Sequence, residues 1–161
     1  MPGGIELRHG RDLARVTREL RRMDDKELLK RFRRELRTAA KPLVPAVRAS
    51  IRQIPSKRPY TPTGLRGQMS KATALEVKTT GRQAAVIIRV DGRKMPAGMR
   101  SVQSYMEGER PYQRWRHPVF GHDVWVQQKP NPYFYRVMRM AGPLARSAVN
   151  KVMDKVSKDL A

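Results

Sequence analysis

Imidazole, indole and phenyl side chains gather in one short segment, residues 114–134. The segment holds both tryptophans, two of the three histidines and two of the three phenylalanines. His117 and His122 lie five residues apart with Asp123 adjacent, which would supply half of a zinc site. The third histidine, His9, is remote, and the chain has no cysteine. We therefore expect the imidazoles to form hydrogen bonds within a loop or an interface, and we expect no metal.

Acid–base catalysis is the other chemistry that these residue types would allow. Glu107 and Glu109 precede the histidines, and small basic nucleases use scattered His and Glu residues of this kind. The surrounding stretch MEGERP is, however, typical of a turn with solvated acids. The sequence has neither a phosphate-binding P-loop nor a nucleophile elbow. It therefore indicates no catalytic site and no cofactor.

The elements that must position this segment begin with a helical amino-terminal part. Leu13, Val16 and Leu20 share one face of a short helix, and apolar residues recur at three- and four-residue steps from Leu28 to Ile54.

The second helical pattern carries its own start and stop signals. Asp24 and Glu27 have the spacing of a capping box. Pro42 and Pro45 remove backbone donors, so we expect a break near Lys41 before the helix resumes. The proline at position 55 ends the pattern.

The rest of the chain predicts a small antiparallel sheet and a last helix. Prolines and glycines indicate a loop at 56–72, and two strands follow at 74–94 with a turn at 79–82. Residues 95–111 are compatible with a strand or a short helix, ending in a turn. The final helix, with a kink at Gly142–Pro143, should bury one face. That face consists of Val137, Met140, Leu144, Ala148, Val152, Val156 and Leu160.

The predicted fold is α+β, with amphipathic helices flanking a small antiparallel sheet. We expect a single domain over residues 1–161. Its helical part covers 1–55, loops and the small sheet cover 56–131, and the carboxy-terminal helix covers 132–160.

Charge is the strongest compositional signal. The chain has 35 Lys and Arg residues against 14 Asp and Glu, a formal net charge of +21. Such a chain repels itself unless nucleic acid, an acidic protein or an anionic membrane is near. We expect contact with DNA or an acidic partner at Arg31, Arg33, Arg34 and Arg37. There is no apolar stretch of signal-peptide or membrane-spanning length, so we expect synthesis in the cytoplasm and no membrane partner.

A stand-alone nucleic-acid-binding protein or basic nuclease satisfies the same electrostatic test. The sequence nevertheless shows no zinc finger, no aromatic RNA-binding strand motif and no helix-turn-helix pattern. This class of protein remains the alternative outside any assembly.

Three stretches, in this order, resemble the motifs of one known family. The first, near P-x-x-T-G-x-L-x-x-S, has Pro62, Thr63, Gly64, Leu65 and Ser70. The second is a compressed Y-x-x-x-x-E-x-G with Tyr105, Glu107 and Gly108. The third, R-W-R-H-P-x-F-G followed by W-V and P-x-F, has Arg114, Trp115, Arg116, His117, Pro118, Phe120, Gly121, Trp125, Val126, Pro132 and Phe134. The chain thus resembles the small tail-component, or tail-completion, family of long-tailed double-stranded DNA bacteriophages.

This resemblance implies a non-enzymatic structural protein of the virion, at the head–tail junction or upper tail, in a ring of copies. The implied neighbours are the head-closure protein, the tail terminator and the tail tube, with contact to double-stranded DNA or the tape-measure protein. A tail terminator that caps the tube is the alternative within the same assembly.

For the aromatic segment, this resemblance implies contacts between subunits of the assembly. Aromatic residues and arginine are enriched at interface anchors, and prolines and glycines reduce the entropy lost on docking. We expect anchoring, partly in the subunit's own core and partly in assembly contacts, from Trp115, His117, Phe120, Trp125 and Phe134.

Overall fold

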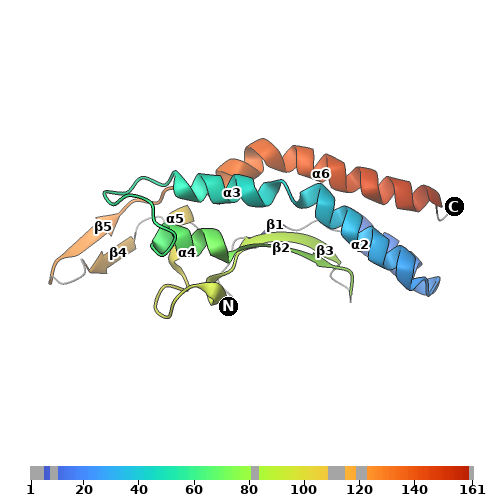
Figure 1. Ribbon diagram of the computed structural model, residues 1–161, viewed down its shortest axis with the longest axis horizontal. Coiled ribbons are helices and arrows are strands. Elements are labelled where there is room, and N and C mark those ends of the chain that lie inside the picture. Colours follow the sequence, from blue (N-terminus) through green and yellow to red (C-terminus); the bar gives the residue numbers. More distant parts are fainter. Residues whose placement is uncertain (1–5, 8–10, 81–83, 109–114, 119–122, 160–161) are drawn as a thin grey trace.

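Three layers of helix and sheet lie along the long axis of the molecule (Figure 1). Helices α2 and α3 lie between α6 on one side and a three-stranded sheet on the other. The computed structural model describes residues 6–7, 11–80, 84–108, 115–118 and 123–159. The elements are β1 (Glu6–Leu7), α1 (Arg11–Arg22), α2 (Lys26–Ala40), α3 (Leu43–Arg52), α4 (Leu65–Ala72), β2 (Thr73–Lys78), β3 (Ala85–Val90), the 3₁₀ turn η1 (Gly92–Lys94), α5 (Val102–Glu107), β4 (Trp115–Pro118), β5 (Trp125–Gln128) and α6 (Phe134–Asp159). The predicted α+β class is confirmed.

The main sheet has the order β1-β3-β2 and is antiparallel throughout its described strands. Leu75 pairs with Ile88, and Val77 pairs with Val86, so these four side chains share one face of the sheet. They pack against helix residues in the core. The two predicted strands are confirmed. Part of the predicted turn at 79–82 lies outside the described residues.

The core has two connected parts. One part joins α3, α4, the sheet and the first half of α6, around Val47, Met69 and Phe134. The other joins α1, α2, the sheet and the second half of α6, around Leu20 and Phe32. The helices of the amino-terminal part therefore bury the faces that their spacing predicts.

The start of α2 differs by one residue from the predicted cap. Asp25, not Asp24, is the N-cap, and its carboxylate accepts the N–H of Leu28 at 2.8 Å. Asp24 has φ +51° and makes the turn out of α1. The predicted break is confirmed, because α2 ends at Ala40 and α3 begins at Leu43.

The loop expected at 56–72 is wrong for its second half, where α4 forms. The prolines lie before position 63, so none interrupts the helix. Gly67 is inside α4 because the chain passes close by. A Cβ on this residue would lie 2.3 Å from the carbonyl oxygen of Pro62. Residues 102–107, left open between strand and helix, form α5.

Helix α6 is continuous through Pro143, and the predicted face is only partly correct: Val156 is buried and Val137 and Val152 pack against the core, but Met140 and Leu144 do not. Met140 and Leu144 are 77% and 76% exposed. The other buried residues of the helix are Phe134, Met138, Gly142, Val149 and Met153. Leu160, the last residue of the predicted face, lies outside the described residues. Over the part of the chain that the structure describes, no helix is long and apolar enough to cross a membrane.

Candidate assembly interface

The aromatic segment, expected to be a loop, contains a β-hairpin. Strands β4 and β5 pair antiparallel from Trp115 opposite Gln128 to Pro118 opposite Trp125. The hairpin lies at one end of the molecule, beyond the main sheet, and the carboxy-terminal end of α6 lies at the other (Figure 1). Val124 and Trp125 are 57% and 54% exposed. The hairpin therefore presents apolar surface away from the core.

Trp125 is held in place by its own hairpin. Pro118 faces Trp125 in the register, and Arg116 faces Gln127. The alternation of a strand puts Arg116 and Trp125 on the same face. The guanidinium carbon of Arg116 lies 5.4 Å from the indole centroid, within cation–π range. This contact positions the indole but leaves more than half of its side chain open to a partner.

The base of the hairpin is fixed to α5. The N–H of Asn131 donates to the carbonyl of Met106 at 2.7 Å. The amide of Gln128 approaches the Met106 sulfur at 3.6 Å. Gly108, which ends α5, has φ +81°, and a Cβ there would lie 2.8 Å from Pro130. Glycine is therefore required at this position for two reasons, its left-handed backbone and the nearby proline ring.

Glu107 connects α5 to the start of α6. Its side chain is buried and accepts three backbone N–H groups, those of Tyr133 and Phe134 at 2.8 Å and that of Tyr135 at 2.9 Å. The first amides of a helix have no partner within the helix, and a carboxylate also complements the positive end of the helix dipole. Glu107 thus caps α6 from another element. The expectation of solvated acids in this stretch is wrong for Glu107, and Glu109 lies outside the described residues.

The five expected anchor residues fall into three groups. Phe134 is fully buried in the chain's own core, so it is unavailable to a partner. Trp125 is exposed. Trp115 and His117 lie in β4, where only their backbone is described, and Phe120 lies outside the described residues.

The metal hypothesis involved His117, His122, Asp123 and His9, of which His9 and His122 lie outside the described residues. Within the described ranges, no group of three His, Cys, Asp or Glu residues could hold a metal ion.

The four arginines of α2 have different environments. Arg31 pairs with Glu35 at 3.0 Å, and Arg33 donates to the hydroxyl of Thr79 at the end of β2. Arg34 and Arg37 are exposed, and no ion pair of their side chains occurs with the described residues. Exposed Lys30 and Lys41 lie on the same face, four residues from Arg34 and Arg37 respectively. The basic surface is thus Arg34, Arg37 and Lys41, together with Lys30, whose ammonium lies 3.9 Å from the exposed carboxylate of Glu27.

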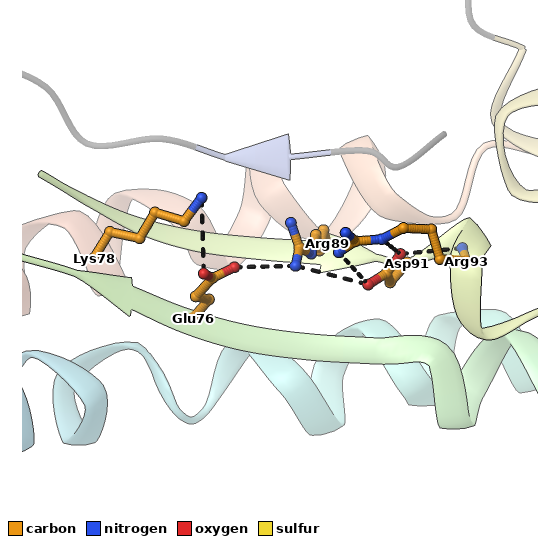
Figure 2. Close-up of polar contacts among 5 residues, drawn as sticks. All are labelled: Glu76, Lys78, Arg89, Asp91 and Arg93. Carbon is orange, nitrogen blue, oxygen red and sulfur yellow. Dashed lines mark hydrogen bonds and ion pairs between the residues drawn. The ribbon is translucent and has the colours of Figure 1, made fainter. Parts of the chain in front are cut away.

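A second charged group lies beside the main sheet (Figure 2). Arg89 contacts Glu76 at 3.0 Å and Asp91 at 3.7 Å, and Arg93 contacts Asp91 at 2.9 Å. Lys78 lies 3.7 Å from Glu76. Hydrogen bonding from the Arg93 side chain lowers the pKa of Asp91, against the opposing effect of burial. Both acids are engaged by basic residues, so this group stabilises the sheet and the turn after β3.

Sequence reasoning missed a second exposed apolar surface, Met140 and Leu144 on α6. It had placed both residues in the core. The available signal was that the first half of α6 is apolar on more than one side, so one stripe had to remain exposed.

No protein-family model, no curated protein and no solved structure matches this chain. The family resemblance therefore remains an expectation from the sequence motifs between Pro62 and Phe134.

Proposed function

We propose that this protein is a non-enzymatic structural component of a long-tailed bacteriophage virion. Copies of the chain form a ring at the head–tail junction or upper tail, which completes or connects the tail. The observation that carries the proposal is the β4–β5 hairpin, which extends from the body with Val124, Trp125 and Val126 exposed.

A two-stranded hairpin is marginally stable alone in water and needs packing on at least one face. Residues 125–127 of β5 are all exposed, so the chain itself leaves much of this hairpin uncovered. A neighbouring copy would supply the missing surface. Exposed aromatic residues beside arginine, as in Trp125 and Arg116, are typical of interface anchors.

A ring requires two different surfaces on each copy, because a heterologous contact joins one patch to another. Met140 and Leu144 form an apolar patch on α6, a separate element from the hairpin. This patch is the counterpart that we assign to the hairpin of the next copy.

The motif residues support the proposal through their architectural roles. Glu107 and Gly108 fix the relative positions of α5, the hairpin base and α6. Gly64 directly precedes α4. These side chains and turns shape the domain, which agrees with a protein whose function is contact.

The net charge of +21 on each copy favours binding of the ring to an acidic partner. The face formed by Lys30, Arg34, Arg37 and Lys41 would meet DNA, the tape-measure protein or an acidic neighbouring ring. The same face favours one second candidate, a stand-alone nucleic-acid-binding protein.

The test is complementation of a phage that lacks this gene. Trp125→Ser combined with Val124→Ser should give separate heads and tails in electron micrographs, with few infectious particles. Met23→Ser is the matched control, because Met23 is 55% exposed but lies between α1 and α2. Normal particles from a folded double variant would contradict the proposal.

A further inference from the structure

A groove lies between the end of α3, the start of α4 and helix α5. Its volume is about 760 Å³, in the range of sites that bind peptides and small molecules. Apolar lining comes from Ile54, Leu65, Met99, Val102 and Met106. Two prolines, Pro55 and Pro59, add to this surface, and Gln128 of the hairpin closes one side.

Hydrogen bonds from Arg66 hold one wall of the groove in place before any ligand binds. Its guanidinium donates to the carbonyls of Arg52, Ile54 and Arg58 at 3.0, 3.1 and 2.7 Å. These bonds satisfy carbonyls at the end of α3 and fix the loop that follows it. The guanidinium also lies 5.8 Å from the ring centroid of Tyr60. A preformed wall lowers the entropy cost of binding.

The charged side chains described in the groove lining are all basic. Among the described residues, the lining includes Arg58 and Arg66 and no acidic residue. From position 36 to position 75 the sequence has eight Lys and Arg residues and no Asp or Glu. Arg58 is exposed, and its side chain has no ion pair with the described residues. The positive end of α4 adds a field of the same sign at this wall.

We infer that this groove binds a peptide segment of a partner protein that carries apolar side chains flanked by carboxylates. The apolar side chains of the peptide contact Leu65 and Val102. The flexible side chains of Met99 and Met106 adapt to their shape. The carboxylates pair with Arg58 at the rim. This inference does not depend on ring formation, since the lining residues that it uses all belong to one copy.

The experiment measures binding of a fluorescein-labelled peptide, Glu-Glu-Leu-Phe-Glu-Glu, by anisotropy at physiological salt. Two further probes have Gln in place of every Glu, or Gly in place of Leu and Phe. We expect the original peptide to bind more tightly than both, because the site needs charge and apolar surface together.

Variants then locate the site. Arg58→Gln should weaken binding about threefold, the scale of an exposed ion pair. Leu65→Ser should weaken it about tenfold through lost apolar contact. The control Lys151→Gln removes the same charge from an exposed position on α6 and should leave binding unchanged. Circular dichroism checks that each variant is folded.

Three results would overturn the inference. Equal binding of all three peptides would show that the groove selects nothing. Equal loss in Lys151→Gln and Arg58→Gln would show only general attraction to the net charge. Sedimentation of the unliganded chain that changes with Leu65→Ser would assign the groove to a second copy instead.

Discussion

The carboxylate of Glu107 accepts the backbone N–H of Tyr133 at 2.8 Å, across 26 residues of sequence. The intervening chain contains the hairpin, so this contact closes the segment at its base. The same oxygen accepts the N–H of Phe134, and the other carboxylate oxygen accepts that of Tyr135. This one buried side chain therefore joins the end of α5 to the start of α6, the two elements between which the hairpin extends.

Replacing Glu107 tests this role. Glu107→Ala should lower the free energy of unfolding by about 3 kcal/mol, because it leaves buried amides without an acceptor. Glu107→Gln keeps one acceptor oxygen and should cost about 1–2 kcal/mol. Urea denaturation measures both, and Glu27→Gln, on an 86% exposed side chain, is the control with an expected loss of at most about 0.5 kcal/mol. Equal stability of the alanine variant and the parent would refute the capping role.

Two glycines inside helices should respond in opposite directions. Gly67→Ala should cost about 2 kcal/mol, because the new Cβ would meet the backbone of Pro62 at 2.3 Å. Gly142→Ala should gain about 0.5–1 kcal/mol, since its nearest neighbour is 3.9 Å away and alanine favours the helix. Thermal unfolding of the two variants measures the difference. A gain in stability from Gly67→Ala would mean that the packing around α4 is looser than described.

The stability of the chain in acid should depend on Asp91. The Arg93 side chain lowers the pKa of this carboxyl below its ordinary value of 3.8. A depressed folded-state pKa stabilises the protein above the unfolded-state pKa, and this contribution disappears as pH falls through the folded-state value. Asp91→Asn should therefore show a smaller loss of stability below about pH 4 than the parent.

Urea unfolding between pH 5 and pH 2 measures this difference. Asp123→Asn, at an exposed position, is the control and should keep the acid dependence of the parent. Parallel curves for the parent and Asp91→Asn would contradict the role of this ion pair.

Arg34 and Arg37, the exposed arginines of α2 without an ion pair to a described residue, should contribute most to any DNA affinity of this face. Arg34→Gln with Arg37→Gln should reduce the slope of log K against log salt by about 2, if each side chain neutralises one phosphate. The control pair is Arg15→Gln with Arg31→Gln, because each of these arginines pairs with a glutamate of its own helix. Filter binding to duplex DNA over a salt series measures the slopes. Equal losses in both double variants would indicate diffuse attraction instead of a defined face.

The sequence predicted best where one periodic pattern dominated. The spacing of Leu13, Phe32 and Leu36 identified α1 and α2, and the prolines at 42 and 45 located the break between α2 and α3. The cap moved from Asp24 to Asp25 because two adjacent aspartates both have a suitable side chain. Geometry, not composition, decides which one receives the N–H of Leu28.

The sequence-based prediction failed where contacts between residues far apart in the sequence determine the local structure. In the first half of α6 two apolar stripes have helical spacing, and the core cluster that contains Phe134 and Met138 together with residues of α3 selected one of them. The tight passage at Gly67 depends on Pro62, which the order of residue types does not reveal. The capping role of Glu107 depends on amides 26 to 28 residues away, so no local pattern could indicate it.

The amino-acid composition of residues 114–134 identified the candidate interface, and the structure corrected which of its residues are exposed. The concentration of aromatic residues identified the segment, and the motifs predicted a role for it in assembly. Only the structure separates Phe134, which is buried in the core, from Trp125, which is exposed. The local sequence, a tryptophan between Val124 and Val126, is equally compatible with a buried and with an exposed side chain.

The most direct test of the central claim is photocrosslinking in assembled particles, with a benzophenone amino acid in place of Trp125. We predict covalent dimers in which position 125 of one copy is joined to α6 of the next, near Met140 or Leu144. The same probe at Met23 should give no such dimers. If position 125 gives no product, or links only to molecules other than this chain, the hairpin is not the ring contact.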